Sequence, residues 1–277
     1  MSLVFAAFCP HPPIIIPTIG SKEDLRQINK TTLAFKSLTQ KLKDSKAETL
    51  IVISPHGNIF SNVFCINTSK EFFGDFSLFD DFSSQFYFNN DLELNNQIIA
   101  DCLDKKIPLK KIEEKSLDHG SLVPLFFLSQ KNKFKIIPLG YSFLSIKSHF
   151  NFGKSIQKTI TEERFKKTLI GKRILDKKVA VLASGDMSHR LNQSAPAGYS
   201  PFGRIFDEAV ISSLLSNNAS KILDIDPNLS EKAGECGFRS LAILLGILDG
   251  LKAKPEVLSY ENPFGVGYLT VNFSLKK

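Results

Sequence analysis

Three short apolar segments of this 277-residue chain each lead into a loop that contains a histidine. Continuous apolar runs of this length, bounded by Pro or Gly, are typical of strands buried on both faces of a parallel sheet. Open α/β sheets bind their ligands at the carboxyl ends of such strands. The pattern therefore predicts that three histidines meet at one edge of a sheet. The segments are Leu3–Phe8 before His11, Thr49–Ser54 before His56, and Val179–Ala183 before His189.

Amphipathic helices are predicted between these segments. In Glu23–Lys43, apolar residues recur at spacings of three and four. The alternation predicts one α/β domain over residues 1–277, with a central, largely parallel (mixed) sheet flanked by helices. The Phe-rich stretch Phe72–Phe82 is predicted to be a loop. The other predicted helices are Asp91–Asp104, Ser145–Ile160, Gly203–Leu215 and Phe238–Leu251, and the other strands are Asn62–Thr68, Gln85–Phe88, Phe134–Leu139, Val257–Tyr260 and Tyr268–Phe273.

Composition and charge argue against several classes of protein. The 43% hydrophobic content is far from that of a disordered chain. The apolar N-terminus has no basic region and is interrupted by four prolines, so neither a signal peptide nor a membrane helix is predicted. The net charge of +7 concentrates in Lys105–Lys115 and Arg164–Lys178, where acidic and apolar residues are interspersed. Solvated surfaces are favoured over a nucleic-acid interface, because no binding motif accompanies the charge.

A shared divalent metal would explain the gathering of the histidines. Neutral imidazole is the commonest metal ligand, and two histidines with one carboxylate leave half of the coordination sphere open, which suits Fe(II) or catalytic zinc. Glu235 is the best candidate carboxylate because glycines flank its loop, although a Glu at a helix start commonly interacts with the helix dipole. His119 precedes an apolar run and joins the candidate set. His149, on a predicted helix, is interpreted as structural.

The four cysteines predict no thiolate cluster. They contain no C-x-x-C pair and do not make a disulfide framework in a chain of this length, so the cytoplasm is the expected compartment. Cys236 beside Glu235 is interpreted as a buried thiol in preference to a further ligand. Tyr199 and the turn at Pro263 are interpreted as ordinary loop packing. The chain is compatible with a homo-oligomer, but no segment predicts one.

Seven motifs, in chain order, resemble the class III extradiol ring-cleavage dioxygenases, the group that contains the catalytic subunit of protocatechuate 4,5-dioxygenase. The resemblance covers nearly the whole chain and is nearest to the branch associated with the AmmeMemoRadiSam system, which borders the Memo proteins. The motifs are Cys9-Pro10-His11-Pro12-Pro13, Ser54-Pro55-His56-Gly57, Leu117-Asp118-His119-Gly120, Ser184-Gly185-Asp186-Met187-Ser188-His189, Ala195-Pro196-Ala197-Gly198-Tyr199, Gly234-Glu235-Cys236-Gly237 and Pro263-Phe264-Gly265-Val266-Gly267-Tyr268.

The resemblance implies a role for each candidate residue. His11, His56 and Glu235 would hold Fe(II), with Zn, Mn or Cu as alternatives. His189 would be the catalytic base, and His119 a second active-site histidine that faces substrate or oxygen. One extradiol-dioxygenase-like domain would use O2 to cleave a catechol-type ring next to its diol, in the catabolism of aromatic compounds, without nucleic-acid or membrane partners.

Two other functions stay open from the sequence. A Memo-like protein would bind a metal or small ligand in the same pocket for redox or regulatory work, without ring cleavage. A zinc hydrolase would use the two histidines and the glutamate to activate water, but the helical H-E-x-x-H spacing is absent. The intact His119 and His189 favour a dioxygenase.

Overall fold

A central eight-stranded sheet organises the computed structural model, which describes residues 2–161, 177–216 and 218–275. Its strands are β1 (Ser2–Cys9), β2 (Thr49–Ser54), β3 (Phe64–Asn67), β6 (Leu109–Ile112), β7 (Lys135–Gly140), β8 (Lys178–Ser184), β9 (Ala253–Glu261) and β10 (Tyr268–Leu275). The order across the sheet is β6-β3-β7-β2-β8-β1-β10-β9. The four strands β7-β2-β8-β1 are mutually parallel, whereas β10 is antiparallel to β1 and β3 to β7. The predicted α/β architecture with a mixed, largely parallel sheet is confirmed.

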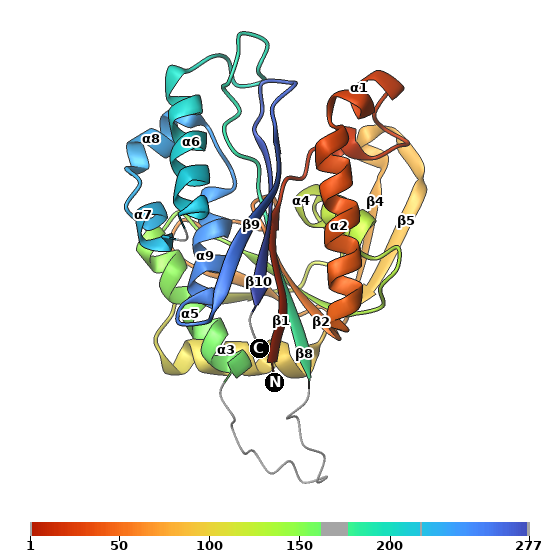
Figure 1. Cartoon of the computed structure of the whole chain (residues 1–277). Helices are drawn as coiled ribbons and strands as arrows, with labels where there is room; N and C mark the ends of the chain where they lie inside the picture. The colour runs from red at the N-terminus through yellow and green to blue at the C-terminus, as the bar shows by residue number, and fades with distance from the viewer. Residues whose placement is uncertain (1, 162–176, 217, 276–277) are drawn as a thin grey trace.

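Helices cover both faces of the sheet (Figure 1). Side chains of β1 show why its sequence is continuously apolar: Ala6 and Phe8 pack into the core on one face, while Phe5 and Ala7 pack into the core on the other. The first core includes residues of α3 (Leu92–Asp104), α5 (Ile146–Thr161), α6 (Pro201–Leu215) and α9 (Phe238–Leu248), with the short α7 (Ala219–Leu223) and α8 (Pro227–Ala233) nearby. The second core includes residues of α2 (Asn29–Ser45) and α4 (His119–Leu128). The 3-10 turn Pro13–Ile15 and α1 (Lys22–Gln27) precede α2 in the chain.

The predicted single helix Glu23–Lys43 is wrong in one respect, because it divides into α1 and α2 at Ile28. The carboxylate of Glu261, at the end of β9, accepts hydrogen bonds from the backbone N–H groups of Lys30 (3.2 Å) and Thr31 (2.7 Å). These bonds satisfy donors that a helix start leaves without an intrahelical partner. The break thus depends on a contact distant in sequence, which local apolar spacing does not reveal.

The loop predicted at Phe72–Phe82 is also wrong. The segment forms β4 (Glu71–Phe76), the 3-10 turn Ser77–Phe79 and the start of β5 (Asp81–Asn89), which pair as an antiparallel hairpin. Phe72 and Phe76 are buried, but aromatic residues also occupy outward positions, such as Phe82, which is 75% exposed. Aromatics on both sides hide the alternation by which a strand is recognised.

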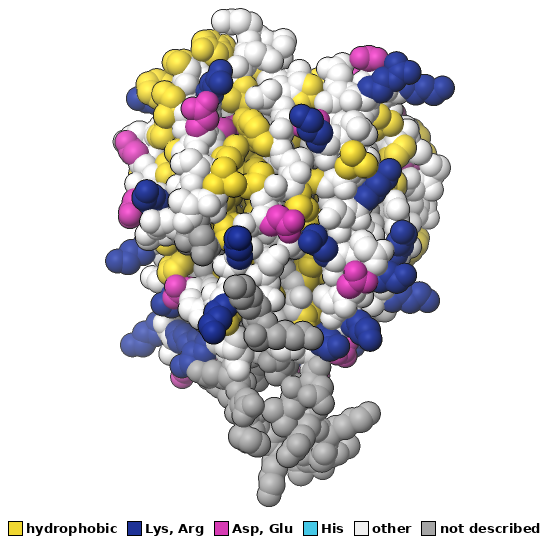
Figure 2. All heavy atoms as spheres, in the orientation of Figure 1, with side chains coloured by type: hydrophobic (Ala, Val, Ile, Leu, Met, Phe, Trp, Pro, Cys, Tyr) yellow, Lys and Arg dark blue, Asp and Glu magenta, His cyan; other side chains and the backbone are white. Residues whose placement is uncertain are grey.

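Charge is dispersed over the surface that the structure describes. Lys105–Lys115 includes β6, at the edge of the sheet, and its exposed lysines agree with a solvated surface. Figure 2 shows basic and acidic side chains interspersed on the face that carries β9. Nearly all of Arg164–Lys178 lies outside the described residues. Within the described ranges, every helix is too short or too polar to cross a membrane.

Candidate metal centre

His11 and His56 meet at the carboxyl edge of the sheet. Strands β1 and β2 both neighbour β8, so the loops that follow them lie on either side of the loop after β8. The Nε2 atoms of the two histidines are 2.9 Å apart, and their rings lie edge-on with centroids separated by 4.7 Å. His11 is buried, while His56 is the more exposed. Two of the three predicted ligands are therefore in contact.

A chain of hydrogen bonds orients the His11 ring. Its Nδ1 lies 2.9 Å from Ser184 Oγ, and this hydroxyl donates its only proton to the Gly120 carbonyl at 2.5 Å. Ser184 Oγ must then accept from Nδ1–H, which leaves a lone pair on His11 Nε2. Burial, reinforced by neighbouring histidines, lowers the pKa of His11 to about 3 and that of His56 to about 4. Both rings are therefore neutral near neutral pH, as metal ligation requires.

The two imidazole nitrogens are close enough to act together as ligands. Their Nε2 atoms, 2.9 Å apart, could both contact one divalent ion, because both rings are neutral and imidazole nitrogen is a common metal ligand.

Glu235 and Cys236, which are adjacent in sequence, take different positions. Cys236 Sγ is 3.7 Å from His11 Nε2, and the three ligand atoms of His11, His56 and Cys236 lie within 4.8 Å of one another. The Glu235 carboxylate accepts from the Ser230 hydroxyl (2.7 Å) and from the Phe238 N–H (2.6 Å) at the start of α9. Cys236, and not the Glu235 carboxylate, joins the two histidines in this geometry.

His189 stands beside this group with one ring nitrogen available. Its Nδ1 donates to the Gly234 carbonyl at 2.6 Å, so its Nε2 carries the lone pair. That Nε2 is 3.8 Å from the buried carboxylate of Asp186, which also accepts from the His11 backbone N–H at 3.0 Å. Burial raises the pKa of Asp186, and the charge of His189 opposes the shift. Asp186 lies in a recognised motif, yet the sequence analysis did not single it out.

The loop that carries His189 is anchored by a second buried carboxylate. Asp207 on α6, which is 1% exposed, accepts from the Ser188 N–H at 2.9 Å and from the Tyr260 hydroxyl at 2.6 Å. The Ser188 hydroxyl donates to the Ala233 carbonyl at 2.8 Å. Burial raises the pKa of Asp207 to about 6. These contacts hold the residue before His189 against both α6 and the last residue of α8.

His119 completes the predicted cluster on the other side. As the first residue of α4, it stacks on His56 with ring centroids 4.2 Å apart, and Phe79 lies edge-on to it at 5.6 Å. Asp118 caps α4 by accepting from the Ser121 N–H and accepts a short hydrogen bond from Ser54. Burial lowers the pKa of His119. Its ring thus lies against His56, the more exposed of the two histidines.

His149, interpreted as structural, lies apart from this cluster. It is buried on α5, where its Nδ1 donates to the Ser145 carbonyl at 2.8 Å and its Nε2 accepts from the Ser142 N–H at 3.3 Å. Tyr199 is 54% exposed. The turn after Pro263 packs against the His189 loop, since the Leu191 N–H donates to the Gly265 carbonyl at 3.0 Å.

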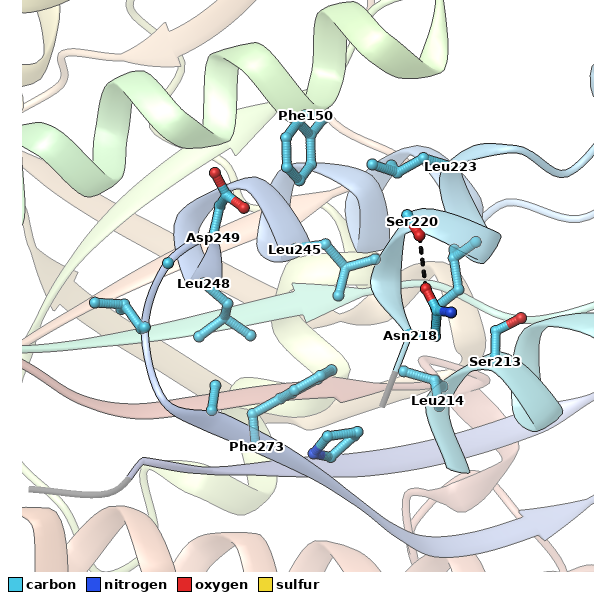
Figure 3. Close-up of a pocket in the computed structure, with 15 residues that line it drawn as sticks. Phe150, Ser213, Leu214, Asn218, Ser220, Leu223, Leu245, Leu248, Asp249 and Phe273 are labelled. Carbon is cyan, nitrogen blue, oxygen red and sulfur yellow. Dashed lines mark hydrogen bonds between the residues drawn. The ribbon is translucent and has the colours of Figure 1, made fainter. Parts of the chain in front are cut away.

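Two cavities differ in their relation to the cluster. One of about 340 Å³ borders His56. Another of about 290 Å³ lies between α5, α6 and α9, with mostly apolar side chains around it (Figure 3), and contains none of the predicted site residues. The first is lined by Asn58, Cys65, Asn67, Asp118 and Ser121 among others, and the second by Phe150, Leu214, Leu245, Leu248 and Phe273 among others.

The chain is similar to known proteins in family, sequence and fold. A family model described as the catalytic LigB subunit of aromatic ring-opening dioxygenase matches residues 5–271. A protein of Clostridium acetobutylicum, whose name carries no function, is 34% identical over 97% of this chain, which spans only 57% of that relative. A 3,4-dihydroxyphenylacetate 2,3-dioxygenase of Escherichia coli is 24% identical over 81% of this chain and 82% of its own length. The crystal structure of an uncharacterized Escherichia coli protein shares the fold, with a TM-score of 0.67 and 18% identity over 98% of this chain and 100% of that one.

Proposed function

Because the chain belongs to the family of catalytic LigB subunits of aromatic ring-opening dioxygenases, we propose that it is a metal-dependent extradiol dioxygenase, which cleaves a catechol-type ring next to its diol. Its small-molecule partners would be that diol and O2. The observation that carries the proposal is the pair of neutral imidazole nitrogens, 2.9 Å apart, with the free Nε2 of His189 close by. These groups supply a metal site and a base in one cluster.

We propose that His11 and His56 hold the metal and that the loop between α8 and α9 supplies the third ligand. Fe(II) is the preferred ion, and Zn, Mn and Cu are alternatives. The family resemblance assigns the third position to Glu235, whereas proximity favours Cys236, whose sulfur already adjoins His11 Nε2. When bound, the ion supplies Lewis acidity towards the two hydroxyls and a redox centre for the reaction with O2.

The protein groups then handle protons and charge. His189 Nε2 accepts a proton from one hydroxyl of the diol, because Gly234 holds the Nδ1 proton in place. The Asp186 carboxylate, 3.8 Å away, stabilises the imidazolium that results. His119, stacked on His56, donates a hydrogen bond to the negative charge that develops on oxygen.

Oxygen consumption by metal-loaded protein tests the proposal directly. Protein is loaded with Fe(II) without oxygen, mixed with a panel of catechols and exposed to air-saturated buffer. We expect one O2 to be consumed for each diol and a yellow ring-opened product to form. Protein that binds both iron and a catechol but consumes no O2 would contradict the proposal.

A Memo-like function without ring cleavage is the second candidate, and the position of Cys236 favours it. Thiolate ligands select copper(I) or zinc over hard cations. A protein that retains copper or zinc through purification, and that consumes no O2 with any catechol after iron loading, would support this candidate in place of the first.

We also propose a cytoplasmic location. All four cysteines are free thiols, and reducing compartments maintain thiols in this state. Fractionation of cells that express the tagged chain checks this, and recovery from an oxidising compartment would contradict it.

A further inference from the structure

The cavity of about 290 Å³ between α5, α6 and α9 is lined on its inner side by apolar side chains from helices and from the sheet. Leu214 on α6, Leu245 and Leu248 on α9, and Phe273 on β10 are only 2%, 5%, 6% and 3% exposed, respectively. In Figure 3, Phe150 lies at the upper border of this group and Phe273 at the lower border, with Leu245 and Leu248 between them. A molecule inside the cavity would therefore contact apolar side chains on several sides.

The charge around the cavity favours a neutral occupant. Asp249, just after α9, is the one ionisable side chain among the described residues that line it. Its carboxylate forms an ion pair with Lys154 Nζ at 2.8 Å, so its charge is already neutralised. A charged ligand would lose its hydration here without gaining an unpaired counter-charge.

One hydrogen-bond donor of the lining is available to a ligand. The Ser220 hydroxyl donates to Asn218 Oδ1 at 2.6 Å, and Figure 3 shows this bond beside the cavity. The other amide atom, Asn218 Nδ2, has no hydrogen-bond partner in the part of the chain that the structure describes. The Ser213 hydroxyl is occupied, since it donates to the Ala209 carbonyl at 2.7 Å. The amide of Asn218 can therefore donate to one oxygen of a ligand.

The volume sets the size of the occupant. A cavity of about 150 Å³ lined by Leu, Ile and Phe stays free of water and admits benzene. At about 290 Å³, this cavity has room for one substituted ring. Side chains that border an empty space lack dispersion contacts on that side, and a ligand of matching size restores them. Apolar lining with a few polar groups is also typical of small-molecule sites.

We propose that this cavity is a second small-molecule site, which binds a neutral, single-ring aromatic molecule with one hydroxyl group, that is, a phenol. Phe150 and Phe273 offer aromatic partners for the ring, and such pairs contribute stabilisation beyond their buried area. The hydroxyl oxygen accepts from the Asn218 amide. The inference goes beyond the proposed dioxygenase and does not rest on it, because the lining includes none of the metal-ligand cluster.

The test uses 4-bromophenol as the probe. It is neutral near neutral pH, its single hydroxyl cannot chelate a metal as a diol does, and its bromine can be located by anomalous scattering in soaked crystals. The comparison ligands are 4-bromobenzoate, which is anionic, and octanoate, which has an acyl chain in place of the ring. Calorimetry on the full-length, Fe(II)-loaded protein without oxygen measures each Kd.

Four variants locate the binding site. Leu214→Phe enlarges a side chain that lines the cavity, and Asn218→Ala removes the donor. Leu215→Phe is the matched control for the first, because it makes the same change one residue further along α6, where the side chain is 69% exposed. His11→Ala alters the metal-ligand cluster and leaves the cavity intact.

We expect 4-bromophenol to bind with a Kd of about 0.1–1 mM, and its bromine to lie in the cavity. Leu214→Phe should weaken binding about 10-fold or more, because the larger ring occupies space that the ligand needs. Asn218→Ala should weaken it about 3- to 10-fold, as loss of one hydrogen bond does. Leu215→Phe and His11→Ala should bind the probe like the unmodified protein. Both comparison ligands should bind about 10-fold more weakly or worse.

Several results would overturn the inference. These are bromine found only at the histidine cluster, binding seen at crystal concentration only, and a Kd that both Leu214→Phe and Asn218→Ala leave unchanged. Tighter binding of octanoate would assign the cavity to an acyl chain and would overturn it as well. Urea unfolding checks that Leu214→Phe protein is folded, and if it is not, Asn218→Ala and the bromine position decide. None of these measurements depends on O2 consumption, so this inference and the proposed dioxygenase fail separately.

Discussion

The two sides of the metal-ligand cluster are built in different ways. His11 and His56 lie two residues past the ends of β1 and β2, so the hydrogen-bonded ladder of the sheet fixes the positions of their backbones. His189 lies in the long loop between β8 and α6, and Cys236 lies in the connection between two helices, so side chains must hold both residues in place. The difference teaches that the sheet positions the two proposed metal-binding nitrogens, while a network of buried polar groups positions the proposed base and the proposed third ligand.

Strand β8 joins the two sides. Ser184, its last residue, bonds the His11 ring, and Asp186, two residues later, bonds the His11 backbone and faces His189. A change on the strand side should therefore remove the metal itself. A change on the loop side should leave the metal and alter how the site reacts.

The largest expected effect belongs to the strand side. His11→Ala and His56→Ala should each lower bound iron, measured by elemental analysis of protein loaded without oxygen, to below a tenth of the unmodified level. Each variant loses one of two adjacent nitrogens and leaves the partner with no second imidazole. His149→Gln is the matched control, since it removes a buried histidine outside the cluster and should keep its iron. Full retention of iron by both alanine variants would end the assignment.

The choice of third ligand gives the next largest effect. Cys236→Ser should weaken iron affinity about 10- to 100-fold, as loss of a contact to the ion does, because its sulfur lies within the ligand group. Glu235→Gln should change affinity less and instead lower the free energy of unfolding by about 1 kcal/mol, since its carboxylate caps α9. Competition with a chromogenic chelator measures the affinities. The reverse order of the two affinities would assign the metal to Glu235.

The same contrast explains what the sequence could reveal. Apolar runs and the Pro or Gly that ends them predict β1, β2 and β8, and hence the common edge at which His11 and His56 meet. Loop conformation is not encoded in such patterns. Whether the side chain of Glu235 or that of Cys236 turns towards His11 depends on the Phe238 N–H at the start of α9, which donates a hydrogen bond to the Glu235 carboxylate. Asp207 could not be assigned either, because its partners Ser188 and Tyr260 are brought to it by the fold.

On the loop side, replacement of His189 should separate chemistry from metal binding. His189→Gln should retain iron and lower kcat about 10²- to 10⁴-fold, because general base catalysis contributes that much. Steady-state O2 consumption with a competent catechol measures the rate, and iron content is measured on the same sample. His119→Gln is the comparison variant, and it should lower kcat without loss of the ability to deprotonate the diol. The absorbance of the bound diol in the absence of oxygen measures this deprotonation. Unchanged turnover by His189→Gln protein would exclude a role as base.

The smallest expected effect tests the anchor of that loop, Asp207. Its pKa of about 6 lies above the value of about 3.9 for an unfolded chain, so between these values the folded state binds more protons. The contribution of Asp207 to stability is therefore largest at low pH and is lost as the pH rises through about 6. The residue itself is buried, Glu235 raises its pKa further, and Tyr260, Ser188 and His189 oppose that shift.

Asn at position 207 cannot titrate, so the difference in unfolding free energy between the unmodified protein and Asp207→Asn should shrink by up to about 3 kcal/mol from about pH 4 to about pH 7. Urea unfolding across this range measures it. Glu208→Gln, an exposed change on the same helix, should give a nearly constant difference, within about 0.5 kcal/mol. If the difference in unfolding free energy for Asp207→Asn also stayed constant with pH, burial would not raise the pKa of the Asp207 carboxyl. This side of the cluster would then be fixed by the backbone, as the strand side is.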